Sequence, residues 1–155
     1  MILEIRRYPD PVLRKKCEPI KEITPEILKL IDDMFETMYK SQGVGLAASQ
    51  VGFLKQLAVV DVGSGPMVFI NPKIVWKKGR EVSEEGCLSV PGKYLNIRRA
   101  KEVKVEAHDK KMEKFEVEAS GLLAICLQQE IDHLNGILML ERTGFFKRMK
   151  IKLFG

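Results

Sequence analysis

The chain has 155 residues, of which 45% are hydrophobic and 30% charged, and its formal net charge is +5. This length and composition are typical of a globular protein that buries its own core, so we expect residues 1–155 to form a single domain. No stretch approaches the roughly 18 apolar residues of a membrane span, and charges interrupt the N-terminal segment where a signal peptide would be apolar. We expect a cytoplasmic protein without a membrane partner.

Three cysteines, Cys17, Cys87 and Cys126, are too few and too scattered for a disulfide framework. In a reducing compartment each is a small buried hydrophobe, a metal ligand or a nucleophile. Lys and Arg concentrate near both ends of the chain. This excess of positive charge favours polyanions such as RNA, but it is also common in proteins without such a partner. We expect no DNA partner.

The first expected element is an amphipathic helix over residues 25–40, where apolar residues recur at helical spacing. Thr24 stands at the N-cap position, Pro25 at the first helical position and Glu26 in the first turn. The helix ends before GVGLAASQVG, residues 43–52, which we expect to form a loop because it contains three glycines.

The periodicity then changes to that of strands. We expect strands at residues 56–62, 67–76, 102–109 and 114–120, with turns at 63–66 and 108–111. Short mixed or antiparallel strands around two helices predict an α+β fold and not a doubly wound one.

A second helix, central to the fold, is expected to begin at Ser120 or Gly121 and to end at Asn135-Gly136. At about 100° per residue, four of its residues fall on one side: Leu122, Cys126, Gln129 and His133. We expect the apolar stripe that packs on the core to lead into the last two. Burying them unpaired costs about 1–3 kcal/mol each, so each needs a metal or a hydrogen-bond partner.

Gln129-Glu130-x-x-His133 has the outline of a metal-hydrolase helix, in which two ligands four residues apart bind one ion and the Glu accepts a proton from water. With Gln in the first ligand position, this motif alone is more often an ordinary helix with satisfied polar residues. Cys87, in the polar turn expected at EEGCLS (residues 84–89), is either a further ligand or a half-buried thiol. Gln50 either donates its amide N–H to an oxyanion or lies in a plain helix-to-strand turn.

Taken together and in this order, GVGLAASQ, EGCLS and QEIDH resemble the three motifs of the peptide deformylases, the last in the place of HExxH. The likeness extends through YPDPVLRKK and Ile70-Asn71-Pro72 and so covers nearly the whole chain. It is similar to the bacterial-type enzymes, which remove the formyl group from the N-terminal methionine of new polypeptides. Ser49 stands where the family often has Pro, and Gln129 stands where it has the first His of HExxH.

The resemblance implies one divalent metal ion, Fe2+ foremost and otherwise Zn2+ or Ni2+, held by Cys87, His133 and Gln129. It gives Glu130 the proton-transfer role, and it places the backbone N–H of Leu88 and the side-chain amide of Gln50 at the formyl oxygen. The substrate is an N-formyl-methionyl peptide. The family's positions for the methionine pocket correspond to Val44, Leu122, Ile125 and Cys126. Those that pair with the substrate backbone correspond to Gly45, Gly86 and Leu88.

Gln129 leaves the activity open, because an amide oxygen is a weaker donor than imidazole toward zinc or iron. Three outcomes follow: weak ligation with residual activity, an empty site without activity, or an engineered or variant change in an active scaffold. The alternative function is that of a catalytically inactive deformylase-like protein that binds N-terminal peptides without metal.

The basic C-terminus, residues 145–155, is expected to be a short helix or a loose tail. Its four cations either dock on the ribosome through ribosomal RNA or belong to a solvated terminal helix: Lys147, Arg148, Lys150 and Lys152. His108 is expected at a strand end or turn and not as a ligand.

Overall fold

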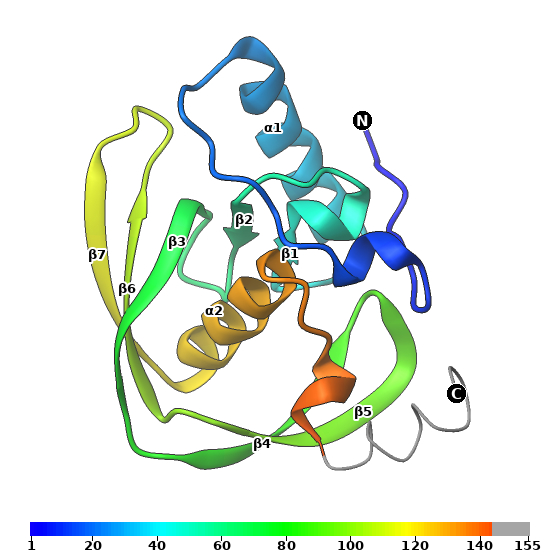
Figure 1. Ribbon diagram of the computed structural model, residues 1–155, viewed down its shortest axis with the longest axis vertical. Coiled ribbons are helices and arrows are strands. Elements are labelled where there is room, and N and C mark those ends of the chain that lie inside the picture. Colours follow the sequence, from blue (N-terminus) through cyan, green and yellow to red (C-terminus); the bar gives the residue numbers. More distant parts are fainter. Residues whose placement is uncertain (144–155) are drawn as a thin grey trace.

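A computed structural model describes residues 1–143 as a helix, a run of antiparallel strands and a second helix at the centre of the molecule (Figure 1). Within this range no helix combines the length and apolar character needed to cross a bilayer. The elements are η1 (Pro11–Arg14), α1 (Pro25–Lys40), β1 (Gly45–Ala47), η2 (Ala48–Val51), β2 (Leu57–Val60), β3 (Met67–Lys78), β4 (Glu81–Cys87), β5 (Val90–Arg99), β6 (Glu102–His108), β7 (Lys114–Ser120), α2 (Gly121–Leu134) and η3 (Met139–Arg142).

The strands form a five-stranded sheet in the order β1-β2-β3-β6-β7 and a separate two-stranded sheet of β4 and β5, and every pairing within them is antiparallel. The predicted α+β class is therefore confirmed. The short C-terminal helix expected at residues 145–155 lies outside the described residues.

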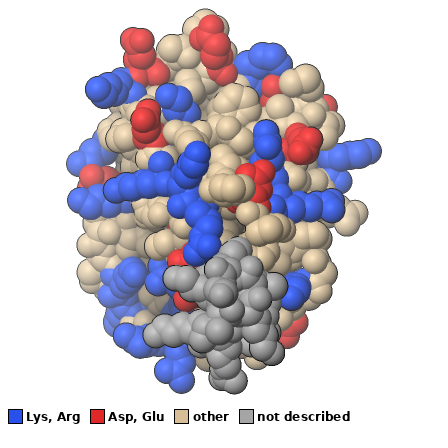
Figure 2. Space-filling view, turned by 45° about the vertical axis from the view of Figure 1, so that its right-hand side comes forward, with Lys and Arg blue, Asp and Glu red and all other residues tan. Residues whose placement is uncertain are grey.

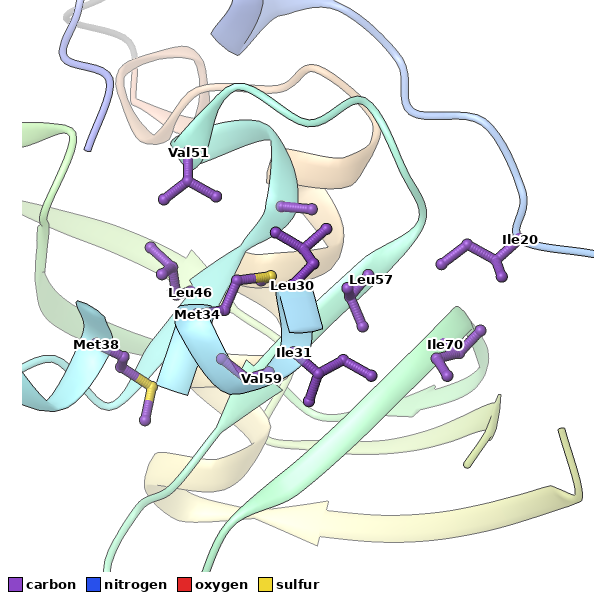
Figure 3. Packing of buried hydrophobic residues seen from close by; sticks show 11 residues of the cluster. Ile20, Leu30, Ile31, Met34, Met38, Leu46, Val51, Leu57, Val59 and Ile70 are labelled. Carbon is purple, nitrogen blue, oxygen red and sulfur yellow. The ribbon is translucent and has the colours of Figure 1, made fainter. Parts of the chain in front are cut away.

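Helix α1 covers the predicted range, and its cap is formed as expected: the Thr24 hydroxyl oxygen accepts a hydrogen bond from the Ile27 N–H at 3.2 Å. Its apolar face is buried through Leu30, Ile31 and Met34, which pack against β2 and β3 (Figure 3). This packing, more than helix propensity, holds a helix of this length in place.

The sequence predicts β2, β3, β6 and β7 within a few residues but misses β1, β4 and β5. The expectation of a loop at residues 43–52 is wrong, because β1 and η2 lie there. The expectation of a polar turn at residues 84–89 holds only for Leu88 and Ser89, because β4 continues to Cys87. Glu85 is the one buried residue of β4. Because this residue is charged, β4 lacks the alternation of apolar and polar residues that predicts a strand.

Helix α2 begins and ends close to the predicted positions, with Ser120 as its N-cap and Asn135 as its C-cap. It lies at the centre of the molecule, between the five-stranded sheet and the β4–β5 ribbon (Figure 1). Leu122, however, is 52% exposed, so the prediction that the apolar stripe of α2 starts at Leu122 is wrong. The helix packs on the sheet through other residues: Ala124, Leu127 and Ile131.

Asn71 ties the N-terminal segment to β3. Its side-chain oxygen accepts from the Ile20 N–H and its amide nitrogen donates to the Ile20 carbonyl oxygen, both at 2.8 Å. Asn71 has a φ of 52°, a left-handed conformation that Asn adopts more readily than most residues. This position therefore needs both the backbone tolerance and the two-sided side chain of Asn.

We expect Asn71→Ala to lower the free energy of unfolding by about 2 kcal/mol, because it leaves both polar groups of the buried Ile20 backbone without partners. Urea unfolding followed by circular dichroism measures the change. The matched control is Asn96→Ala on exposed β5, which we expect to stay within about 0.5 kcal/mol of the parent protein. Equal effects of the two substitutions would contradict the tether.

Candidate metal and hydrolase site

The structure brings the end of β4 against the last turns of α2. Cys87 Sγ lies 3.3 Å from His133 Nε2, although the two residues are 46 positions apart in the chain. Cys87 is the last residue of β4, and a register shift between Gly86 and Cys87 marks a bulge there. A bulge re-aims a side chain at the end of a strand. The thiol and the imidazole thus meet as two potential ligands.

Gln50, from η2, holds its amide beside this pair. Its oxygen accepts from the Ala47 N–H at 2.9 Å, which fixes the orientation of the amide. Its nitrogen donates to the Ser89 hydroxyl at 3.1 Å and to Cys87 Sγ at 3.6 Å. A side-chain N–H therefore stands in a fixed direction next to the sulfur, as an oxyanion donor requires.

Glu130 is buried on α2, the helix that carries His133, and its Oε1 has no hydrogen-bond partner among the described residues. Burial raises the pKa of Glu130 to about 8, against the opposing positive charge of Arg99. A carboxyl whose pKa lies near neutrality can both accept and return a proton.

Gly45 makes this arrangement possible. A Cβ at that position would lie 2.7 Å from Glu130 Oε2 and 2.6 Å from Cys126 Sγ, too close for any side chain. The backbone of β1 therefore runs directly over the carboxylate. Cys126 is buried behind it, with its thiol 3.7 Å from the Val44 carbonyl oxygen.

Burial also sets the protonation of the two potential ligands. It lowers the pKa of His133 to about 4, so the ring is neutral at pH 7. Burial, with the Glu130 charge as a second cause, raises the pKa of Cys87 to about 12, which keeps the sulfur as a thiol. A bound divalent cation has the opposite effect on a thiol, because a sulfur that coordinates a metal is deprotonated. His133 Nδ1 is buried without a hydrogen-bond partner among the described residues.

The residues present fit a metal ion in two of three ligand positions. Two ligands of a tetrahedral zinc ion, one sulfur and one nitrogen, lie about 3.5 Å apart, close to the 3.3 Å between Cys87 Sγ and His133 Nε2. Within residues 1–143, no three side chains of His, Cys, Asp or Glu converge as a metal-binding group. The third ligand expected from the sequence is Gln129, whose amide nitrogen donates to the Gly86 carbonyl oxygen at 3.0 Å.

A buried ion-pair network lies behind the site. The Arg99 guanidinium donates to Glu85 at 2.9 Å and to Asp132 at 2.6 Å, and Arg142 donates to the same Asp132 carboxylate at 2.6 and 2.9 Å. Sequence reasoning missed this network. Neither Glu85 nor Arg99 lies on an expected strand, and charged residues in a strand are usually exposed.

A cavity of about 550 Å³ opens beside the site. Eight of the predicted site residues line it: Val44, Gly45, Gln50, Gly86, Cys87, Leu88, Gln129 and Glu130. Four others do not: Leu122, Ile125, Cys126 and His133. The cavity wall also includes Arg7, from the N-terminal segment, and Tyr94, from β5. Neither was predicted from the sequence, and β5 was not an expected strand.

Comparison with known proteins gives one consistent result. The sequence profile of the family described as polypeptide deformylase matches residues 2–149. The chain is 54% identical to a peptide deformylase of Clostridium botulinum over 139 residues, which are 90% of this chain and 95% of that protein. It is 52% identical to a peptide deformylase of Neisseria meningitidis over 154 residues, which are 97% and 92% of the two chains. The crystal structure of a peptide deformylase from Legionella pneumophila superposes with a TM-score of 0.92 at 44% identity, covering 98% of this chain and 92% of that one.

We expect Arg99→Met to lower the free energy of unfolding by about 3–5 kcal/mol, because it leaves Glu85 buried without a countercharge and leaves Asp132 with Arg142 alone. Urea unfolding is the measurement. Lys104→Met is the matched control, because Lys104 pairs with two exposed carboxylates, Glu116 and Glu118. That surface pairing is worth about 0–1 kcal/mol. A loss at Arg99 no larger than at Lys104 would refute a structural role of the network.

Proposed function

Because this chain belongs to the polypeptide deformylase family, we propose that it is a metal-dependent hydrolase that removes the N-formyl group from formyl-methionyl polypeptides. The observation that carries the proposal is the meeting of Cys87 and His133 at 3.3 Å beside the buried carboxyl of Glu130. A pair of potential metal ligands and a proton-transfer group beside one cavity, which Cys87 and Glu130 line, are the parts that a metallohydrolase needs. We take residues 1–155 as one functional domain.

Cys87, His133 and the amide oxygen of Gln129 would hold the ion, which by family resemblance is Fe2+, with Zn2+ or Ni2+ as alternatives. When bound, a divalent ion lowers the pKa of water and polarises a carbonyl oxygen. The chain's own residues supply the rest. Glu130 takes the proton of the attacking water and later gives it to the leaving amine. Its raised pKa, caused by burial, suits both steps.

Charge that develops on the formyl oxygen is stabilised by the side-chain N–H of Gln50 and the backbone N–H of Leu88. The hydrogen bond from Ala47 fixes the Gln50 amide in advance, so little reorganisation is needed during the reaction. Removing one such donor typically lowers the rate by about 10²–10³.

The peptide would lie along the exposed edges of β1 and β4, where Gly45, Gly86 and Leu88 offer backbone groups to an added strand. Val44 would contact the methionine side chain from the cavity wall. Leu122, Ile125 and Cys126 would shape the same pocket from α2. These three residues do not line the cavity beside Cys87. This role therefore requires the methionine side chain to reach past Gly45.

Gln129 weakens this site in two ways. Its amide oxygen is a neutral ligand and a weaker donor than imidazole, and its amide nitrogen is already bonded to the Gly86 carbonyl oxygen. That carbonyl is one of the groups proposed to pair with the peptide. The same glutamine therefore lowers metal affinity and competes for a substrate contact.

A second function is favoured by one observation, namely that no three side chains of His, Cys, Asp or Glu converge here within residues 1–143. It is a catalytically inactive protein that binds N-terminal peptides without metal. Metal analysis of the purified protein separates the two functions. Residues 145–155, which lie outside the described range, carry the further proposal that the basic C-terminus docks on the ribosome.

We expect Gln129→His to raise metal affinity by about 10- to 100-fold, because it restores an imidazole ligand. Bound metal is measured by mass spectrometry after dialysis against limiting Fe2+ or Zn2+ under anaerobic conditions. Hydrolysis of a formyl-Met peptide should rise in the same variant. Adding Cys87→Ser to the Gln129→His variant should cancel the gain in metal.

The matched control is Gln42→His, which adds an imidazole at the exposed loop after α1 on the rim of the same cavity. It should change neither metal content nor rate. If Gln129→His gains neither metal nor activity, the assignment of the metal site is wrong. If the parent protein lacks metal but still binds a formyl-Met peptide, the second function replaces the first.

A further inference from the structure

We propose that a second cavity, on another side of α2, binds a compact polyphosphate anion such as pyrophosphate or the diphosphate group of a nucleotide. This basic cavity has a volume of about 430 Å³ and lies between the connection of β3 to β4, the end of β5, α2 and η3. Six cationic side chains line it: Lys77, Lys78, Arg80, Arg98, Arg99 and Arg142. The proposal is independent of the hydrolase function, because none of these residues lines the cavity beside Cys87.

Its charge is not neutralised from within. Asp132 is the only carboxylate that lines the basic cavity in the described part of the chain. Over residues 1–143, none of the four outer cations has an ion-pair partner: Lys77, Lys78, Arg80 and Arg98. The sequence of residues 143–155 contains neither Asp nor Glu. Like charges in a concave surface focus a positive potential, which a bound anion relieves.

The fold forces these cations together. Gly79, with a φ of 71°, lies in the two-residue connection between β3 and β4, with Lys78 and Arg80 on its two sides. The antiparallel register then pairs Val82 with Arg98 on β5, which brings a further cation to the same end of the ribbon. Figure 2 shows that Lys and Arg cover more of one face of the molecule than Asp and Glu do. In the basic cavity, six Lys and Arg side chains line a concave part of the surface.

The inner wall of the cavity offers donors that are already fixed in place. Arg142 donates to Asp132 through Nε and Nη2, which holds its guanidinium while Nη1 has no hydrogen-bond partner within the described range. Gln128 uses its whole amide on backbone groups of Ala100 and Ala124, so the wall beside it is rigid. A preorganised guanidinium loses little entropy on binding a phosphate oxygen.

The shape and lining favour a small polyphosphate over single-stranded RNA. The volume falls in the range of small-molecule sites, about 300–1,000 Å³. Among the described lining residues there is no aromatic side chain, whereas single-stranded RNA is usually held by bases stacked on aromatic rings. Several unpaired cations around one cavity suit a ligand with several negative charges close together.

The test is calorimetric titration of the full chain with inorganic pyrophosphate, at constant ionic strength in a buffer free of magnesium and peptide. We expect one bound anion per chain. The double variant Arg80→Gln/Arg98→Gln should bind at least about tenfold more weakly, since it removes two charge-assisted donors. The matched control is Lys110→Gln/Lys111→Gln in the exposed β6–β7 turn, which removes the same charge elsewhere and should change affinity less than twofold.

A second pair, Lys77→Gln/Lys78→Gln, gives the same test should the arginine variant fail to fold. Titration with a nucleoside diphosphate distinguishes the two sources of the ligand. Tighter binding than pyrophosphate assigns a nucleotide, and equal or weaker binding assigns the free anion. The proposal is overturned if pyrophosphate does not bind, or if the control Lys110→Gln/Lys111→Gln loses as much affinity as the arginine variant. It is also overturned if a short RNA binds through the residues of the basic cavity while pyrophosphate does not.

Discussion

The site depends on the ion pairs that the buried guanidinium of Arg99 makes. It pairs with Glu85, two residues before Cys87 on β4, and with Asp132, the residue before His133 on α2. The thiol and the imidazole lie in different elements, and few other contacts join the β4–β5 ribbon to the helix. The 3.3 Å between Cys87 Sγ and His133 Nε2 is therefore set largely by ion pairs one or two residues away. A buried charge network of this kind is weak evidence of stability but a strong constraint on geometry once formed.

The same network contributes to the electrostatics of Glu130 and His133. Glu130 lies beside Arg99, Asp132 and Glu85, so one positive and two negative charges act on its carboxyl. Their effects partly cancel, and burial decides the direction in which its pKa moves. For His133 the balance is similar, with Asp132 raising and Arg99 lowering the pKa while burial prevails. The helix thus presents a neutral imidazole and a carboxyl with a pKa near neutrality within one turn.

The sequence predicted those elements whose buried residues are apolar and missed those whose buried residues are charged. Helix α1 and strands β2, β3, β6 and β7 could be predicted because their buried positions are mainly apolar, periodic in α1 and β6 and continuous in β2. The β4–β5 ribbon could not, because Glu85 and Arg99 are charged and their burial depends on each other and on Asp132, which are far apart in the chain. The approach of Cys87 to His133 was predicted through three motifs in a known order and not through periodicity. Leu122 was misplaced because helical spacing gives a side of α2 but not what covers it.

The order of side chains along α2 shows how one helix serves two cavities. Gln129 and Glu130 line the cavity beside Cys87, whereas Gln128 and Asp132 line the basic cavity. Because successive residues on a helix are about 100° apart, neighbours in the sequence face different sides. Asp132 therefore has two roles. Its carboxylate holds Arg99 for the hydrolase site and Arg142 for the basic cavity.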